Sequence, residues 1–240
     1  MKFARSLNLV RFALLIASLL VCFSAAVSAS ETDWRIFMRA STTEYTNAGG
    51  LLQIGSRSDA TDDYDPFIDA AHVPISSNQA GVASFEPTYP HQYLSRNLKT
   101  QIMYPGRKTW TVRLWVGPDY SQDTVRLSLW TISELVPPKS VSTGYQVYCV
   151  GYYLSVIRDP TGTFMPGHEW HLDWERTGTS TNPTWIIDFR NVQGNSQMWG
   201  PSTGVELQAV TYIEPEPASI LTLATGLAAL GGYAWRRKRR

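Results

Sequence analysis

The chain has 240 residues, of which 43% are hydrophobic, 12% aromatic and 17% charged. Extensive disorder is excluded, because a chain of this length and composition can bury a sizeable core. Residues 30–213 hold 13 Lys and Arg against 18 Asp and Glu, a net charge of −5, whereas both ends of the chain are basic. An acidic body repels phosphate backbones, so we expect no nucleic acid among the partners.

The first 29 residues have the pattern of a secretory signal peptide. Three basic residues come before position 12, and the apolar run FALLIASLLVCF follows at 12–23. As a helix this run is about 18 Å long, too short for the roughly 30 Å hydrocarbon core of a bilayer, so cleavage is favoured over an uncleaved anchor. Small residues stand at 27–29, which predicts that signal peptidase cuts between Ala29 and Ser30.

The body, residues 30–213, alternates apolar and polar residues as strands do. Apolar side chains fall on one face at 34–40, 110–116, 125–129, 168–174 and 205–209, and turn-forming residues separate these runs. Helical periodicity is hard to find here. We therefore predict about eight to ten short strands in an all-β fold, an antiparallel β-sandwich of the jelly-roll or immunoglobulin-like kind.

Residues 58–87 lack clear alternation and include a dense acidic segment. Four of its carboxylates are candidate hard oxygen ligands for a structural Ca²⁺ ion: Asp62, Asp63, Asp65 and Asp69. The spacing differs from an EF-hand, because the twelfth residue from Asp59 is Ala70 rather than Glu. The other interpretation is that these aspartates are solvated turn formers.

Catalytic motifs are absent from the sequence. The run His168-Glu169-Trp170-His171 differs from the zinc-protease motif, because histidines three apart in a strand lie on opposite faces. Neither a nucleophile elbow nor a phosphate loop occurs. Carboxylate pairs for glycoside hydrolysis can be drawn from Glu169, Asp173, Glu175 and Asp188, but any acidic domain offers such pairs. We therefore expect no enzyme and assign no catalytic residue.

Eight of the nine tryptophans lie in the body, where they are candidates for stacking on sugar rings. Trp115 and Trp130 fall opposite the expected core faces of their strands, so one interpretation is that both are exposed and available for stacking. The alternative is that both are large core fillers in a sheet covered on both sides. Carbohydrate binding is accordingly a second functional hypothesis.

The C-terminus carries three features in order. Pro215, Glu216 and Pro217 come first, then eighteen uncharged residues from Ala218 to Trp235, then the basic run Arg236, Arg237, Lys238, Arg239 and Arg240. As a single transmembrane helix, 218–235 spans about 27 Å, enough for a slightly thinned bilayer. Basic residues resist translocation, so we expect the tail to stop in the cytoplasm while the acidic body lies outside.

Residues 214–240 resemble the PEP-CTERM sorting signal, a tripartite tail on exported proteins of bacteria, many of which make exopolysaccharide. In that family the Pro-Glu-Pro motif is taken to be recognised by a membrane-embedded cysteine transpeptidase, the exosortase, which would remove the tail. The resemblance implies that residues 215–217 are the recognition element, 218–235 the span and 236–240 the stop signal. One position departs from the family, which often has Val before the first proline where this chain has Glu214.

Together these features predict three segments: a signal peptide at 1–29, an exported β-sandwich at 30–213 and a sorting and anchor segment at 214–240. We expect a structural or adhesive protein of the cell envelope or the extracellular matrix. Its expected partners are the export machinery, signal peptidase, the membrane and an exosortase-like transpeptidase. A carbohydrate-binding module for exopolysaccharide is the alternative, and a glycoside hydrolase is a weaker third hypothesis.

Overall fold

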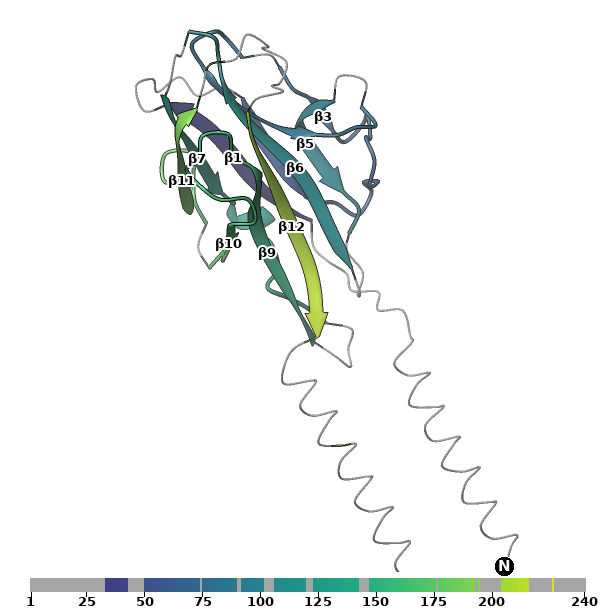
Figure 1. The fold of residues 1–240 in the computed structure, drawn as a ribbon. Coiled ribbons are helices and arrows are strands. Elements are labelled where there is room, and N and C mark those ends of the chain that lie inside the picture. The colour runs from purple at the N-terminus through teal and green to yellow at the C-terminus, as the bar shows by residue number, and fades with distance from the viewer. Residues whose placement is uncertain are drawn as a thin grey trace, which may run out of the picture.

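The computed structural model describes residues 33–42, 50–73, 75–89, 92–101, 106–119, 123–142, 147–175, 177–192, 194, 204–215 and 226. In these ranges the chain is all-β, which confirms the predicted fold class (Figure 1). The strands are β1 (Trp34–Thr42), β2 (Leu51–Ser56), β3 (Ala70–Ala71), β4 (Ala80–Phe85), β5 (Tyr93–Lys99), β6 (Arg107–Val116), β7 (Asp123–Trp130), β8 (Ser140–Ser142), β9 (Val147–Arg158), β10 (Glu169–His171), β11 (Trp185–Val192) and β12 (Val205–Pro215). A short 3-10 helix, η1 (Ser133–Leu135), lies between β7 and β8.

All twelve strands belong to one curled, mixed sheet. Its main path runs β10-β9-β12-β6-β4-β5-β2-β1-β7-β11, with β3 beside β5 and β8 beside β9. Neighbouring strands pair antiparallel except β2 and β5, which run parallel. The prediction of a purely antiparallel arrangement is therefore wrong at this pair. A parallel pair needs a long crossover, and the chain from 57 to 92, which includes β3 and β4, provides it.

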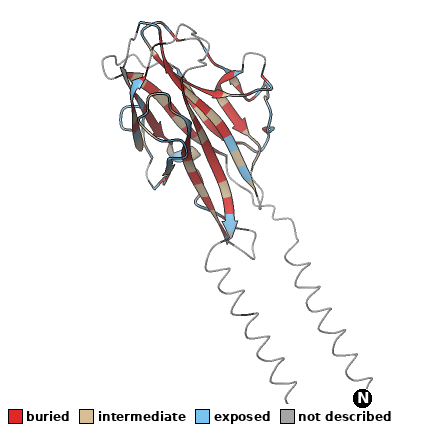
Figure 2. Cartoon of the chain, in the orientation of Figure 1, coloured by how far each residue is buried: buried red, intermediate tan, exposed pale blue. Residues whose placement is uncertain are grey.

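The core lies inside the curl, where several strands bury alternate side chains and β4 buries five residues in a row (Figure 2). In β1, burial alternates residue by residue along the whole strand, as the sequence predicted. Trp34 of β1 lies edge-on to Trp110 of β6, with ring centroids 5.8 Å apart, and to Tyr152 of β9, at 5.2 Å. These contacts join strands that are distant along the sheet path, so the sheet folds back over its own inner face.

The two ends of the strand path also approach each other. Phe164, in the connection between β9 and β10, packs edge-on against Phe189 of β11, with ring centroids 5.4 Å apart. Trp170 of β10 lies 6.3 Å from the same ring. Figure 1 shows β10 and β11 on the same side of the body. The curl is thus closed by aromatic side chains at a place where no backbone ladder joins these two strands in the described sheet.

The end of β12 shifts one predicted boundary. The strand continues through Glu214 and Pro215, which pair with Cys149 and Tyr148 of β9, so the sheet extends two residues beyond the expected end of the body at 213. Within the described residues, no helix is long and apolar enough to cross a membrane. The predicted signal peptide with its Ala29–Ser30 cleavage site and the predicted span at 218–235 lie outside the described residues, Gly226 excepted, as do Glu216, Pro217 and the basic run 236–240.

Candidate functional site: an aromatic groove on the outer face of the sheet

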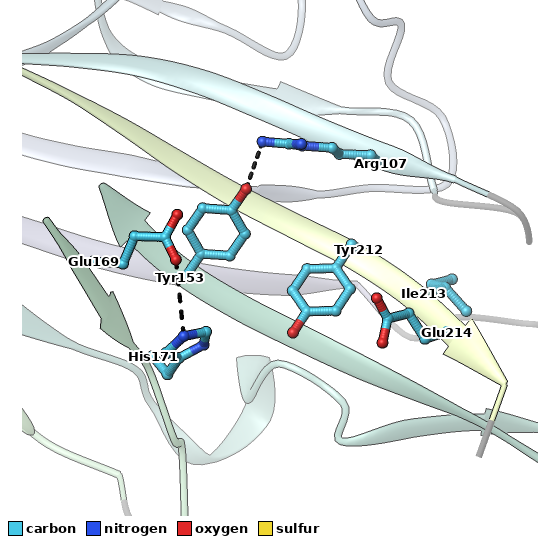
Figure 3. Close-up of a pocket in the computed structure, with 7 residues that line it drawn as sticks. All are labelled: Arg107, Tyr153, Glu169, His171, Tyr212, Ile213 and Glu214. Carbon is cyan, nitrogen blue, oxygen red and sulfur yellow. Dashed lines mark hydrogen bonds and ion pairs between the residues drawn. The ribbon is translucent and has the colours of Figure 1, made fainter. Parts of the chain in front are cut away.

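A groove of about 310 Å³ opens on the outer face of β6, β12, β9 and β10 (Figure 3). It is lined by Arg107, Tyr153, Glu169, His171, Tyr212, Ile213 and Glu214. The strand register gathers these residues. Tyr212 of β12 pairs with Arg107 of β6, and His171 of β10 pairs with Tyr153 of β9, so side chains from four strands meet on one face.

Two tyrosine rings form the floor of the groove. The rings of Tyr153 and Tyr212 have centroids 5.9 Å apart and are tilted by 55°, and His171 lies 6.0 Å from Tyr153. A Cβ atom added to Gly151 would lie 2.2 Å from Cζ of Tyr212. Gly151 is therefore required for the Tyr212 ring to lie close over the backbone of β9.

Charged groups surround this floor. The Arg107 guanidinium donates a hydrogen bond to the Tyr153 hydroxyl and lies 5.6 Å from the centre of the ring. His171 Nε2 lies 3.9 Å from a carboxylate oxygen of Glu169. Burial raises the pKa of the Tyr212 phenol, and the negative charge of Glu214 raises it further. A phenol is already protonated at neutral pH, and this shift keeps Tyr212 a hydrogen-bond donor to a higher pH than an ordinary tyrosine.

A second hollow of about 330 Å³ adjoins the groove and shares His171 and Tyr212 with it. Lys139 lies along this hollow, with its amine 3.3 Å from a carboxylate oxygen of Asp173 and 3.3 Å from one of Glu175. Together the two hollows offer ring faces, hydrogen-bond donors and carboxylate acceptors on an open surface. Such a surface suits a flat polar ligand that carries several hydroxyl groups.

The structure does not place the two predicted stacking tryptophans at the surface. Trp115 is 0% exposed, and Ile75 and Tyr93 pack with it in a small cluster on the outer face. Trp130 is 6% exposed, and its ring stacks on Phe37 at 5.8 Å. Their strand faces point outward as the sequence indicated, but the connection between β3 and β4 covers Trp115. The prediction that these two residues stack on glycans is therefore wrong.

The acidic segment is held by the chain's own hydrogen-bond donors. Asp69 is buried and accepts hydrogen bonds from the backbone N–H groups of Asp65 and Leu98, each at 2.9 Å. Asp62 pairs with Lys108, and the Asp65 carboxylate accepts from the backbone N–H of Phe67. Asp63 is exposed. Among the described residues there is no group of three or more His, Cys, Asp or Glu that is placed to hold a metal ion, and calcium binding stays a prediction.

The carboxylates considered for glycoside hydrolysis are divided over the surface. Asp188 of β11 is bound by two nitrogens of Arg126, each at 2.9 Å. Asp173 and Glu175 share Lys139, and only Glu169 lines the groove. The groove residues Tyr153, Tyr212 and Arg107 were missed by the sequence analysis. Two groove residues could have been found from the alternation of apolar and polar residues at 205–209. Continued along the strand, this alternation predicts that Tyr212 and Glu214 face outward.

Comparison with known proteins gives no relative from which to transfer a role: no protein-family model matches the chain, and no curated protein or solved structure is similar to it.

Proposed function

We propose that the chain is an exported surface protein of structural or adhesive type, presented by its C-terminal segment in the cell envelope or the surrounding matrix. Residues 1–29 direct it to the export machinery, and signal peptidase cuts after Ala29. The body, a curled sheet that we assign to the sandwich class, then lies outside the membrane. Residues 218–240 hold it there until an exosortase-like transpeptidase acts at the motif 215–217.

The end of β12 is the observation that carries this proposal. Pro215 is the last residue of the strand, and its partner in β9 is Tyr148. Proline has no N–H to donate to the ladder, which favours ending the strand there. The motif therefore begins at the last described residue of the sheet, directly after the folded body. A sorted surface protein needs a folded body followed by an address segment, and this order along the chain supports the proposal.

Fractionation and intact mass test the proposal in a host that contains an exosortase. The double variant Pro215→Ala/Pro217→Ala should keep its C-terminal segment and stay in the membrane fraction, whereas the unchanged chain loses the mass of that segment. Pro160→Ala, in an exposed turn of the body, is the matched control and should be processed normally. If both proteins keep the segment, it is a permanent anchor and the sorting proposal is wrong. If both lose it, residues 215–217 are not the element that the transpeptidase recognises.

Carbohydrate binding is the second candidate, and the tyrosine groove favours it. Sugars present apolar ring faces and hydroxyl edges together, and the Tyr153 and Tyr212 rings lie beside Arg107 and Glu169 in the same hollow. The open shape of the groove suits a passing chain of sugars rather than a small enclosed ligand. This candidate replaces the two buried tryptophans with two half-buried tyrosines as the stacking residues.

Affinity electrophoresis in gels containing exopolysaccharide tests the second candidate. Tyr153→Ala and Tyr212→Ala should each weaken binding roughly tenfold, the effect of losing one well-packed aromatic contact. Phe67→Ala is the matched control, because Phe67 is 92% exposed and lies outside the groove. If Tyr153→Ala, Tyr212→Ala and Phe67→Ala are retarded equally in the gel, the groove is not part of the surface that binds the polysaccharide.

A further inference from the structure

Arginines line the outer face of the sheet where β5, β2 and β1 lie side by side. We call this surface the arginine face; it consists of Arg35, Phe37 and Arg39 of β1, Gln53 of β2 and Arg96 of β5. In the register, Phe37 pairs with Gln53, and Gln53 pairs with Arg96. Residues two apart in a strand share a face and are about 7 Å apart, so Arg35 and Arg39 flank Phe37 on the same side. All five are half-buried.

The three guanidinium groups have no carboxylate partner among the ion pairs of the described residues. Arg35 donates to the amide oxygen of Gln53 at 3.4 Å, and Arg96 donates to the backbone carbonyl of Ile68. Arg39 Nε is shielded from solvent, and no hydrogen-bond acceptor for it is present in the described part of the chain. Buried polar groups are normally paired, so this face has donors in excess.

The nearest acids do not neutralise the face. Asp59 is paired with Arg57, with nitrogen and oxygen 2.6 Å apart, and a carboxylate oxygen of Asp33 accepts from the backbone N–H of Ser58. Burial lowers the pKa of Arg35, the positive charges of Arg96 and Arg57 lower it further, and the negative charge of Asp33 acts in the opposite direction with a smaller effect. The field at this face is therefore positive, although the body as a whole has an excess of acids.

We propose that the arginine face binds an acidic polysaccharide through its carboxylate groups. A guanidinium presents two parallel N–H donors that match the two oxygens of a carboxylate. The Phe37 ring and the Gln53 amide lie between the arginines, where they can contact the neutral parts of sugar rings between successive charges. This inference extends the proposed surface role to a class of partner, and its site is separate from the tyrosine groove.

Charge density favours a polysaccharide over the other common polyanions. Duplex DNA carries one charge per roughly 1.7 Å of its axis, so the acidic body repels it more strongly than it repels a polysaccharide with one charge per sugar ring. An anionic membrane surface is normally bound by a cluster of roughly four to eight Lys or Arg residues or by exposed apolar side chains, and this face has three arginines. The exposed large apolar side chains of the described residues, Phe67, Val73, Val147, Ile157, Met165 and Ile186, all lie outside the arginine face.

The test uses the full chain purified in detergent and measures binding to alginate, a polymer of uronic acids, with neutral dextran as the reference polymer. Arg35→Gln and Arg96→Gln should each weaken alginate binding roughly tenfold, and added salt should weaken it further. Arg190→Gln is the matched control, because it removes an equal charge from an exposed position of β11. Arg35→Lys keeps the positive charge but lacks the two parallel N–H donors of a guanidinium. Its affinity for alginate should lie between those of the unchanged chain and Arg35→Gln.

Several outcomes would overturn the inference: equal affinity of Arg96→Gln and the unchanged chain, dextran binding as tight as alginate, or tighter binding to duplex DNA or to vesicles of anionic lipid. Thermal unfolding of each variant separates the loss of a contact from the loss of the fold. If Arg35→Gln unfolds at a lower temperature than the unchanged chain, the affinity of Arg35→Lys is used instead to test the role of the Arg35 guanidinium. Because the assay uses purified protein, its failure leaves the sorting proposal intact. Failure of the sorting assay likewise leaves this inference intact.

Discussion

Acidification should destabilise the body through one buried histidine. His72 follows β3 and is 4% exposed, and its ring lies edge-on to Trp115 with centroids 5.2 Å apart. Neither ring nitrogen has a hydrogen-bond partner among the described residues. Burial penalises the imidazolium and lowers the pKa of His72 from 6.5 to about 4.

The sign and size of the effect follow from proton linkage. Below pH 6.5 the unfolded chain binds a proton at this histidine, whereas the folded chain binds it only below about pH 4. Stability contributed by the neutral ring is therefore complete above pH 6.5 and is lost as the pH falls toward 4. A shift of this size corresponds to about 3 kcal/mol. Burial raises the pKa of Asp69, which acts in the opposite direction, because its protonated form is favoured in the folded state.

Urea unfolding of His72→Phe across this pH range isolates the histidine from Asp69. Phenylalanine keeps a ring against Trp115 and removes both unpaired nitrogens, so the variant should be at least as stable at pH 7 and should lose about 3 kcal/mol less between pH 7 and pH 4. The control Phe67→Ala removes a 92% exposed ring and no titratable group, so it should keep the original slope. An equal loss of stability in His72→Phe and the unchanged chain would refute the reasoning.

Two further substitutions test the packing of the site and of the acidic segment. Gly151→Ala places a Cβ where the Tyr212 ring lies, so it should cost about 1–3 kcal/mol in chemical unfolding and weaken any glycan binding in the groove. Asp69→Ala removes the acceptor of two backbone N–H groups, one of them on Leu98, and should lower stability by about 2–4 kcal/mol, whereas Asp63→Ala should change it by less than about 0.5 kcal/mol.

The inner face of the fold could be predicted from the sequence because its cause is local. Apolar side chains at alternate positions can be buried only on one side of a strand, and this rule correctly gave the core positions from Trp34 to Ala40 and from Val205 to Ala209. The pairing of strands, by contrast, could not be predicted from the sequence. No residue in β2 or β5 indicates that they run parallel, since this depends on the path of the chain between them.

Exposure on the outer face could not be predicted from alternation, because it depends on what a distant segment covers. Trp115 and Tyr153 both occupy outward positions of their strands, and the sequence does not distinguish them. The structure does, since the connection that carries Ile75 packs over Trp115, whereas Tyr153 remains in an open groove. Glycines in the strands indicate where a large ring lies close to the backbone. Gly81 leaves room for the Trp115 ring and Gly151 for the Tyr212 ring, but neither ring can be identified before the strands are paired.

One strand connects the groove with the end of the body. Tyr212 lies on the floor of the groove, Glu214 lines its rim, and Pro215 is paired with Tyr148 at the last rung of the same strand. Any enzyme that must extend the chain around Pro215 in its own active site has to separate these last residues of β12 from β9. Separation moves Glu214 and disturbs the groove, so a ligand bound in the groove opposes cleavage, by the reciprocity of linked equilibria. Occupancy of the groove is therefore expected to slow processing at residues 215–217, whereas two independent sites would show no coupling.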